Sequence, residues 1–193
     1  MSDSRAGILR DARRHLTSPV FEHSISVAEC AQDLAARYGV DSYNAWVAGV
    51  LHDWDKALGD EDILARAQDF GLPVLPEEAA NPYLLHARTG AQAVKGLFRE
   101  VNDEIARAIE RHTLGDRDMQ PLDMVLYVAD MIEPGRRFPG VDVLRESVGA
   151  VSLGELFALC YQHSVEHLVR ARRPMHPLTI EVWNGLIARE RLV

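Results

Sequence analysis

Residues 48–56 read Ala-Gly-Val-Leu-His-Asp-Trp-Asp-Lys, an apolar segment that ends in two adjacent metal-ligating side chains, His52 and Asp53. The apolar part is typical of a buried helix, where an unpaired polar group costs free energy. We therefore expect a partner for both side chains, and coordination of a metal would satisfy them at once.

Helical patterns extend from this stretch in both directions, and no convincing alternating strand is present. Apolar residues recur at helical spacing over about 22–38, and Gly39 supplies a stop. Ser42 is placed to cap the helix that leads to His52. Short connections between the helices predict one all-α bundle. Further helices are predicted over about 60–70, 83–98, 103–112, 121–133, 153–172 and 177–191, and a proline-rich loop with at most a short helix over 71–82.

The composition is typical of a globular protein, since 47% of the 193 residues are hydrophobic and 26% are charged. No apolar run reaches the length of a membrane helix, and the N-terminus lacks the pattern of a secretory signal. Cys30 and Cys160 lie in apolar helical patterns, which indicates reduced core cysteines in a cytoplasmic protein. The net charge of −8 argues against a protein that coats a nucleic-acid polymer.

Four further residues at or near apolar helical stretches can complete a metal site, namely His23, His86, His112 and Asp130. Imidazoles and carboxylates without a thiolate suit Fe, Mn, Co, Zn or Ni. Six ligands are too many for one catalytic zinc, which usually takes three, but they suit two metals if Asp53 bridges. We expect one metal on His23, His52, Asp53 and Asp130 and the second on Asp53, His86 and His112.

Two adjacent metals are a known arrangement for phosphoryl chemistry. The positive groups near these ligands in the sequence are Lys56, Arg88, Arg136 and Arg137, and both lysine and arginine bind phosphate. Lys56 follows Asp53 by three residues, so we expect it to contact phosphate or a metal-bound water. Thr113 directly follows His112 and is a candidate substrate contact.

The ordered set of His23, His52-Asp53 and Asp130 resembles the HD-domain superfamily of metal-dependent phosphohydrolases. His86 and His112 resemble the additional ligands of the subset that holds two metals. Four segments resemble the bacterial YqeK family more closely: Leu51-His52-Asp53-x-x-Lys56, Leu84-Leu85-His86, His112-Thr113-x-Gly115 and Ala129-Asp130-x-Ile132-Glu133-Pro134-x-Arg136.

This resemblance implies an HD-domain helical bundle that forms a single domain over residues 1–193. Its core would lie at about 20–142, with C-terminal helices at about 150–193 packed on it. The implied activity is symmetrical cleavage of diadenosine tetraphosphate into two ADP, with two divalent metals, iron being favoured. A hydroxide bridging the metals would attack an inner phosphorus. Asp53 and Lys56 would be catalytic, and Lys56, Thr113 and Arg136 would contact the nucleotide.

Three alternatives stay open on the sequence. The same site would serve a nucleotidase or phosphodiesterase acting on another nucleotide. A di-iron HD-type oxygenase would use the same ligand set, and a non-catalytic signalling module is a third reading. His163 and His167 lie four residues apart on a predicted helix and are interpreted as surface or packing residues. Metal identity, base preference, oligomeric state and the roles of Arg88 and Arg137 are not assigned.

Overall fold

The computed structural model describes residues 4–190, and within this range the chain is helical and contains no β-strand, which confirms the predicted all-α class. Its α-helices are α1 (Ser4–His15), α2 (Ser18–Tyr38), α3 (Ser42–Leu51), α4 (Asp60–Asp69), α5 (Pro76–Ala80), α6 (His86–Leu97), α7 (Asp103–Arg111), α8 (Pro121–Ile132), α9 (Val141–Glu146), α10 (Leu153–Arg170) and α11 (Pro177–Glu190). A 3-10 helix, η1 (Pro82–Leu85), leads directly into α6.

The helices α2 and α3 form the hairpin on which the bundle is built. α2 ends at Gly39, whose φ of 72° lies in the left-handed region that glycine adopts without strain. The cap of α3 is Asp41, which accepts a hydrogen bond of 2.7 Å from Asn44 N, so the prediction that Ser42 caps this helix was wrong by one residue. Gly49 lets the two helices touch, since a Cβ there would lie 2.5 Å from Ala28 Cα.

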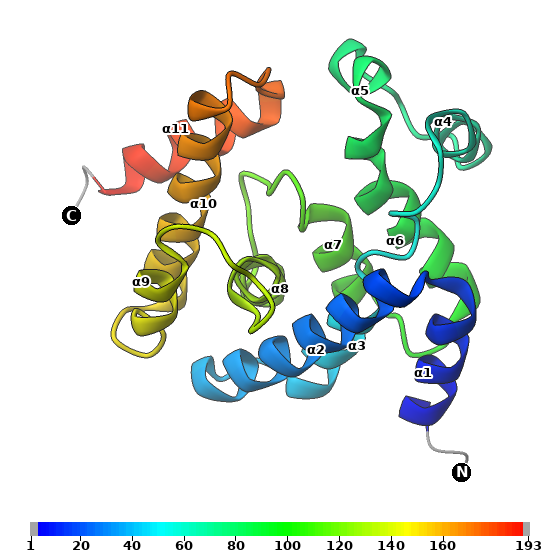
Figure 1. Cartoon of the computed structure of the whole chain (residues 1–193), viewed down its shortest axis with the longest axis horizontal. Helices are drawn as coiled ribbons and strands as arrows, with labels where there is room; N and C mark the ends of the chain where they lie inside the picture. Colours follow the sequence, from blue (N-terminus) through cyan, green and yellow to red (C-terminus); the bar gives the residue numbers. More distant parts are fainter. Residues whose placement is uncertain (1–3, 191–193) are drawn as a thin grey trace.

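Helix α8 occupies the centre of the bundle. It is seen end-on in the middle of Figure 1, with α2 and α3 below it, α7 beside it and α10 on the other side. Most of its side chains are buried because it packs against all four of these helices. Asp130 lies near the C-terminal end of α8, close to the end of α3. The packing of α8 against four helices therefore fixes the position of Asp130.

Two helices were not predicted from the sequence. α1 has a narrow apolar stripe, formed by Ile8 and Ala12 and continued by Leu16 beyond its end, and this stripe packs against α3. α9 is only six residues long, and Val141 and Leu144 are its buried side chains. Helices this short or this polar are stabilised by tertiary packing more than by their own periodicity, and periodicity alone misses them.

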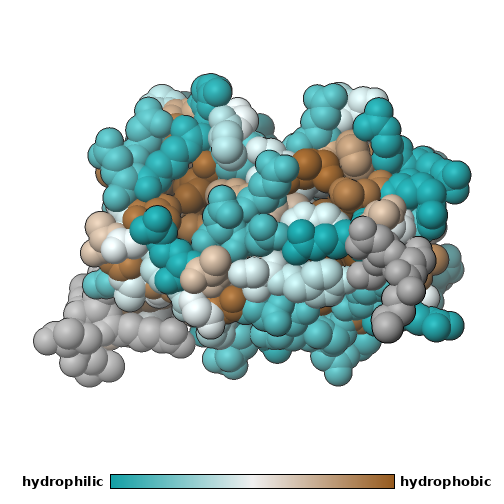
Figure 2. Space-filling model, turned by 90° about the horizontal axis from the view of Figure 1, so that it is seen from below, coloured by the Kyte–Doolittle hydropathy of each residue, from teal (hydrophilic) through white to brown (hydrophobic). Residues whose placement is uncertain are grey.

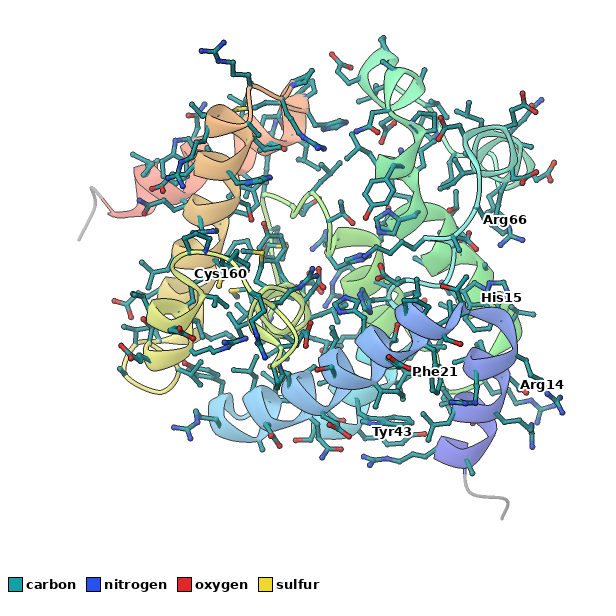
Figure 3. All side chains as sticks on the ribbon, in the orientation of Figure 1. Arg14, His15, Phe21, Tyr43, Arg66 and Cys160 are labelled. Carbon is teal, nitrogen blue, oxygen red and sulfur yellow. The ribbon has the colours of Figure 1, made fainter. Side chains whose placement is uncertain are left out.

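The C-terminal helices α10 and α11 pack as a pair beside α8. Phe157, Cys160 and Tyr161 are buried on α10, and Figure 3 shows Cys160 on the side of α10 nearest α8. Cys30 and Cys160 are both free thiols, as predicted. On the face shown in Figure 2, hydrophilic side chains cover most of the surface and hydrophobic ones gather in recesses between them. None of the described helices is long and apolar enough to cross a membrane.

Candidate metal centre

The six residues predicted as metal ligands come together at the middle of the bundle. His23 projects from α2, and His52 and Asp53 follow the last residue of α3. The remaining three are His86 at the start of α6, His112 at the end of α7 and Asp130 in the last turn of α8. Residues that are more than 100 positions apart in the sequence thus meet at one point.

Asp53 lies between two groups of ligands and faces each with a different oxygen. Its Oδ2 is 3.1 Å from His52 Nε2 and 3.7 Å from His23 Nε2. Its Oδ1 is 3.4 Å from His86 Nε2 and 3.6 Å from His112 Nε2. Asp130 belongs to the first group, because its Oδ1 lies 2.9 Å from His23 Nε2. His52, Asp53 and His112 also lie close enough to share one ion, so the two groups adjoin at Asp53 and the division between them stays a prediction.

Backbone carbonyls determine which nitrogen of three imidazoles points into the centre. His52 Nδ1 lies 2.8 Å from Gly49 O, His86 Nδ1 2.6 Å from Tyr83 O, and His112 Nδ1 2.7 Å from Ile109 O. A carbonyl oxygen only accepts hydrogen bonds, so each Nδ1 carries a hydrogen and donates it. In the neutral ring Nε2 then presents a lone pair, the form in which histidine binds a metal.

These lone pairs converge without enough hydrogens to satisfy them. The Nε2 atoms of His86 and His112 are 3.2 Å apart, and the Thr113 hydroxyl, 3.3 and 3.2 Å away, has a single hydrogen to donate. His52 Nε2 and Asp53 Oδ1 are buried with no hydrogen-bond partner. Buried acceptors that face one another are costly unless a cation lies among them. The donor set therefore fits divalent metal ions.

The two carboxylates are ionised at neutral pH. Burial acts to raise the pKa of Asp130, but the neighbouring His23 and the charge of Arg136 outweigh it and hold this pKa far below its usual range. Burial also acts to raise the pKa of Asp53, and the neighbouring His52 and His112 more than reverse that effect. Both side chains thus have the charge that a metal ligand needs.

Two positively charged side chains contact the carboxylates of the centre. Lys56 Nζ lies 2.6 Å from Asp53 Oδ2, and Arg136 donates to Asp130 Oδ1 from Nη2 and to the Asp130 carbonyl from Nε at 2.6 Å. Arg137 instead donates to carbonyls of its own loop, and Arg88 pairs with Glu78 away from the centre. Of the four predicted cations, only Lys56 and Arg136 are therefore brought to the ligands.

Glu133 supports the centre, although in the sequence it appears only as part of the segment Glu133-Pro134-x-Arg136 and no role was predicted for it. Its carboxylate accepts hydrogen bonds from His23 Nδ1 at 3.2 Å, from Ser26 Oγ at 2.6 Å and from the backbone of Gly135. Burial acts to raise the pKa of Glu133, but these hydrogen bonds lower it overall. The signal in the sequence was its spacing: Glu133 follows Asp130 by three residues, where a helical side chain comes back to the same face.

A cavity of about 990 Å³ opens beside the centre. Tyr83, Thr113 and Arg136 line the end nearest the ligands, and α10 supplies the far wall. Arg136 is one of its lining residues and also contacts Asp130, so a ligand in this cavity would lie next to the metal ligands. The cavity is large enough for a nucleotide-sized molecule.

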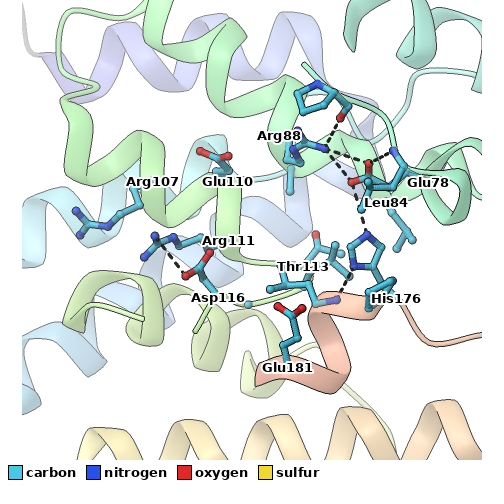
Figure 4. Close-up of a pocket in the computed structure, with 17 residues that line it drawn as sticks. Glu78, Leu84, Arg88, Arg107, Glu110, Arg111, Thr113, Asp116, His176 and Glu181 are labelled. Carbon is cyan, nitrogen blue, oxygen red and sulfur yellow. Dashed lines mark hydrogen bonds and ion pairs between the residues drawn. The ribbon is translucent and has the colours of Figure 1, made fainter. Parts of the chain in front are cut away.

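A second cavity, of about 400 Å³, is separated from the first by residues that line both, Leu84, Thr113 and His176 among them (Figure 4). The arginines in it are already paired with carboxylates. Arg88 lies 2.9 Å from Glu78, and Arg111 contacts both Asp116 and the buried Asp123. These charges are neutralised within the protein, so this cavity is not a built site for an anion.

Known proteins resemble this chain over nearly its full length. A family profile described as HD domain matches residues 20–135. A protein of Bacillus subtilis named bis(5'-nucleosyl)-tetraphosphatase, symmetrical, is 32% identical over 96% of this chain and 98% of its own. One of the same name from Staphylococcus aureus is 33% identical over 80% of this chain and 78% of its own. A crystal structure from Clostridium acetobutylicum, described as a predicted HD superfamily hydrolase involved in NAD metabolism, superposes with a TM-score of 0.89. It is 32% identical, covering 96% of this chain and 97% of that one.

Proposed function

This chain belongs to the HD domain family, in the group that includes the symmetrical bis(5'-nucleosyl)-tetraphosphatases, and on that premise we propose that it hydrolyses diadenosine tetraphosphate to two ADP. The observation that carries the proposal is the convergence of six candidate ligands in a chain related to these enzymes over nearly its full length. A phosphoanhydride hydrolase needs such a centre to activate water and to neutralise phosphate charge.

We propose that the ligands hold two divalent ions, with Asp53 shared between them. His23, His52 and Asp130 would complete one position, and His86 and His112 the other. Bound there, the metals would supply Lewis-acid activation of water and charge neutralisation at phosphate. Histidine and carboxylate ligands admit several metals, and iron is the ion that we expect from the resemblance to the YqeK family.

The chain's own cations would bind the polyphosphate. Lys56 contacts a carboxylate oxygen of Asp53, and Arg136 contacts Asp130. Each side chain therefore needs to move little to reach a phosphate oxygen beside the centre. Thr113 lies at the cavity end that adjoins His86 and His112 and can donate one hydrogen bond to the substrate.

In the reaction that we propose, a water oxygen forms a bond to an inner phosphorus of the tetraphosphate. The bond from that phosphorus to the central bridging oxygen then breaks, and one ADP leaves. The charge that develops on the leaving phosphate would be stabilised by Lys56 or Arg136.

We also propose a single HD domain over residues 1–193, with a core at about 20–142 and the helices at about 150–193 packed on it. The partner would be a small nucleotide, and the location would be the cytoplasm. The packing of α10 against α8 and of α11 against α10 supports the single domain for residues 4–190, while residues 1–3 and 191–193 lie outside the described residues.

Product analysis tests the proposed activity directly. The purified protein is loaded with metal, its metal content is measured, and it is incubated with diadenosine tetraphosphate. We expect ADP as the sole nucleotide product, two per substrate, and no consumption of oxygen. AMP with ATP, or intact substrate in a sample with full metal content, would exclude symmetrical cleavage. Oxygen uptake without phosphoanhydride cleavage would indicate the oxygenase alternative.

A further inference from the structure

The cavity beside the metal centre extends well past the region that phosphate groups would occupy. Its lining includes Arg136, which contacts Asp130, as well as side chains of α10, among them His163, and the loop residue Phe138. Arg136, beside Asp130, is one of two arginines in the lining of this cavity, and the other is the exposed Arg173. The far part of the cavity therefore has room for a chemically different portion of the ligand.

Two aromatic rings form a pair in this far part. The ring centroids of Phe138 and His163 are 4.6 Å apart, with their planes inclined by 32°. Both side chains are half-buried and both line the cavity. Burial lowers the pKa of His163, so its imidazole is neutral at pH 7 and offers a ring face rather than a charge.

The position of Phe138 relative to the centre suits one nucleotide. Phe138 follows Arg136 by two residues, and two residues of extended chain span about 7 Å at most. Arg136 itself contacts Asp130. A ligand whose phosphate lies at Arg136 can therefore reach the ring of Phe138 with a base that is joined to that phosphate through a sugar.

We propose that Phe138 and His163 bind a purine base of the substrate, against the ring surface that they form together. This inference rests on the proposed function, because it takes the phosphates of the same molecule to lie at the metal centre. A base has a large apolar face and every base can stack on an aromatic ring, whereas a neutral phenyl–imidazole pair has no charge with which to attract phosphate. It also gives His163, interpreted from the sequence as a surface or packing residue, a contact with the ligand.

Binding of two probes to the metal-loaded protein tests this without any need for turnover. ADP carries the base, and inorganic tripolyphosphate carries phosphate charge without a base. Calorimetry gives the Kd of each for the wild type, for Phe138→Leu, which keeps apolar volume without a ring, and for Phe138→Trp, which keeps a ring. Phe70→Leu is the control, since Phe70 is an exposed aromatic residue that directly follows α4 and lines neither cavity.

We expect Phe138→Leu to raise the Kd of ADP roughly tenfold, as loss of one stacking ring predicts, and to leave the Kd of tripolyphosphate unchanged. Phe138→Trp and Phe70→Leu should keep the wild-type Kd values for both probes. His163→Leu should raise the Kd of ADP, as Phe138→Leu does. An equal rise in the Kd of both probes in Phe138→Leu, or an unchanged Kd of ADP, would overturn the inference. Failure to cleave diadenosine tetraphosphate would instead refute the proposed function and leave this comparison of Kd values intact.

Discussion

The ammonium of Lys56 lies 2.6 Å from Oδ2 of Asp53, the same oxygen that faces His23 and His52. Burial acts to lower the pKa of Lys56, but the charge of Asp53 outweighs it and the pKa is raised. Lys56 is therefore charged at neutral pH and neutralises a fully buried carboxylate. A metal bound to that oxygen would take over this task and leave the ammonium to meet phosphate.

The substitution Lys56→Met tests that role. We expect kcat/KM for diadenosine tetraphosphate to fall roughly 10–100-fold, because a charge-assisted contact to phosphate is lost. The metal content should stay at the wild-type level, since Lys56 is not a ligand. Lys95→Met is a matched control, as Lys95 pairs with exposed Asp103 on the outer side of α6. Loss of metal in Lys56→Met would show that Lys56 supports the centre instead of binding substrate.

Glu133 positions His23, and Glu133→Gln tests this. A glutamine keeps the size of the side chain but removes the charge that holds the His23 Nδ1 hydrogen. We expect metal affinity at the position containing His23 to fall roughly 10–100-fold, the range found for residues that orient metal ligands. Competition with a chelator measures the affinity. Glu166→Gln on the exposed face of α10 is the control, and equal affinities in the two variants would contradict the role.

Gly49 determines how closely α2 and α3 approach. A methyl group at this position would meet the backbone of Ala28 at 2.5 Å, so Gly49→Ala should destabilise the protein by about 1–3 kcal/mol. The midpoint of urea unfolding measures the change. Gly96→Ala provides the contrast, because Gly96 lies in α6 and the new methyl group would have no atom within 4 Å beyond its chain neighbours and the backbone of its own helix, so we expect no loss there. Equal midpoints for the two variants would show that the hairpin can relax.

The thiol of Cys160 should be unreactive in the folded protein. Burial raises its pKa to about 12 from the ordinary value of 9.0, so almost no thiolate forms at pH 8. We expect a thiol reagent such as DTNB to modify Cys160 only when the protein unfolds. The same shift makes the folded state less stable as the pH rises from about 9 towards 12, because only the unfolded chain then ionises this thiol. Rapid modification at pH 8 under native conditions would contradict this burial.

The six residues that meet at the centre could be selected from the sequence because histidines and aspartates at the ends of apolar helices stand out there. Asp53 directly follows His52, and Asp130 follows a fully apolar turn of α8, so each is conspicuous. The boundaries of their helices were also approximately right. The all-α class followed from the same periodicity, which the structure confirms.

The supporting contacts could not be read in the same way. Tyr83 and Gly49 orient His86 and His52 through backbone carbonyls, and every residue has such a carbonyl. Phe138 lies in a loop and His163 in a helix that is distant in the sequence, so no local sequence pattern predicts their contact. α1 was missed for a related reason, since its stripe of apolar residues is too narrow to indicate burial.

The most direct test of the centre is the metal content of His86→Ala beside that of the wild type and Asp53→Asn. His86 faces only Oδ1 of Asp53, whereas Asp53 faces both groups of ligands. We predict about two metal ions per chain in the wild type, one in His86→Ala, and loss from both positions with no ADP released in Asp53→Asn. Equal loss of both metals in His86→Ala, or a wild type that is active with a single ion, would contradict a centre divided by Asp53.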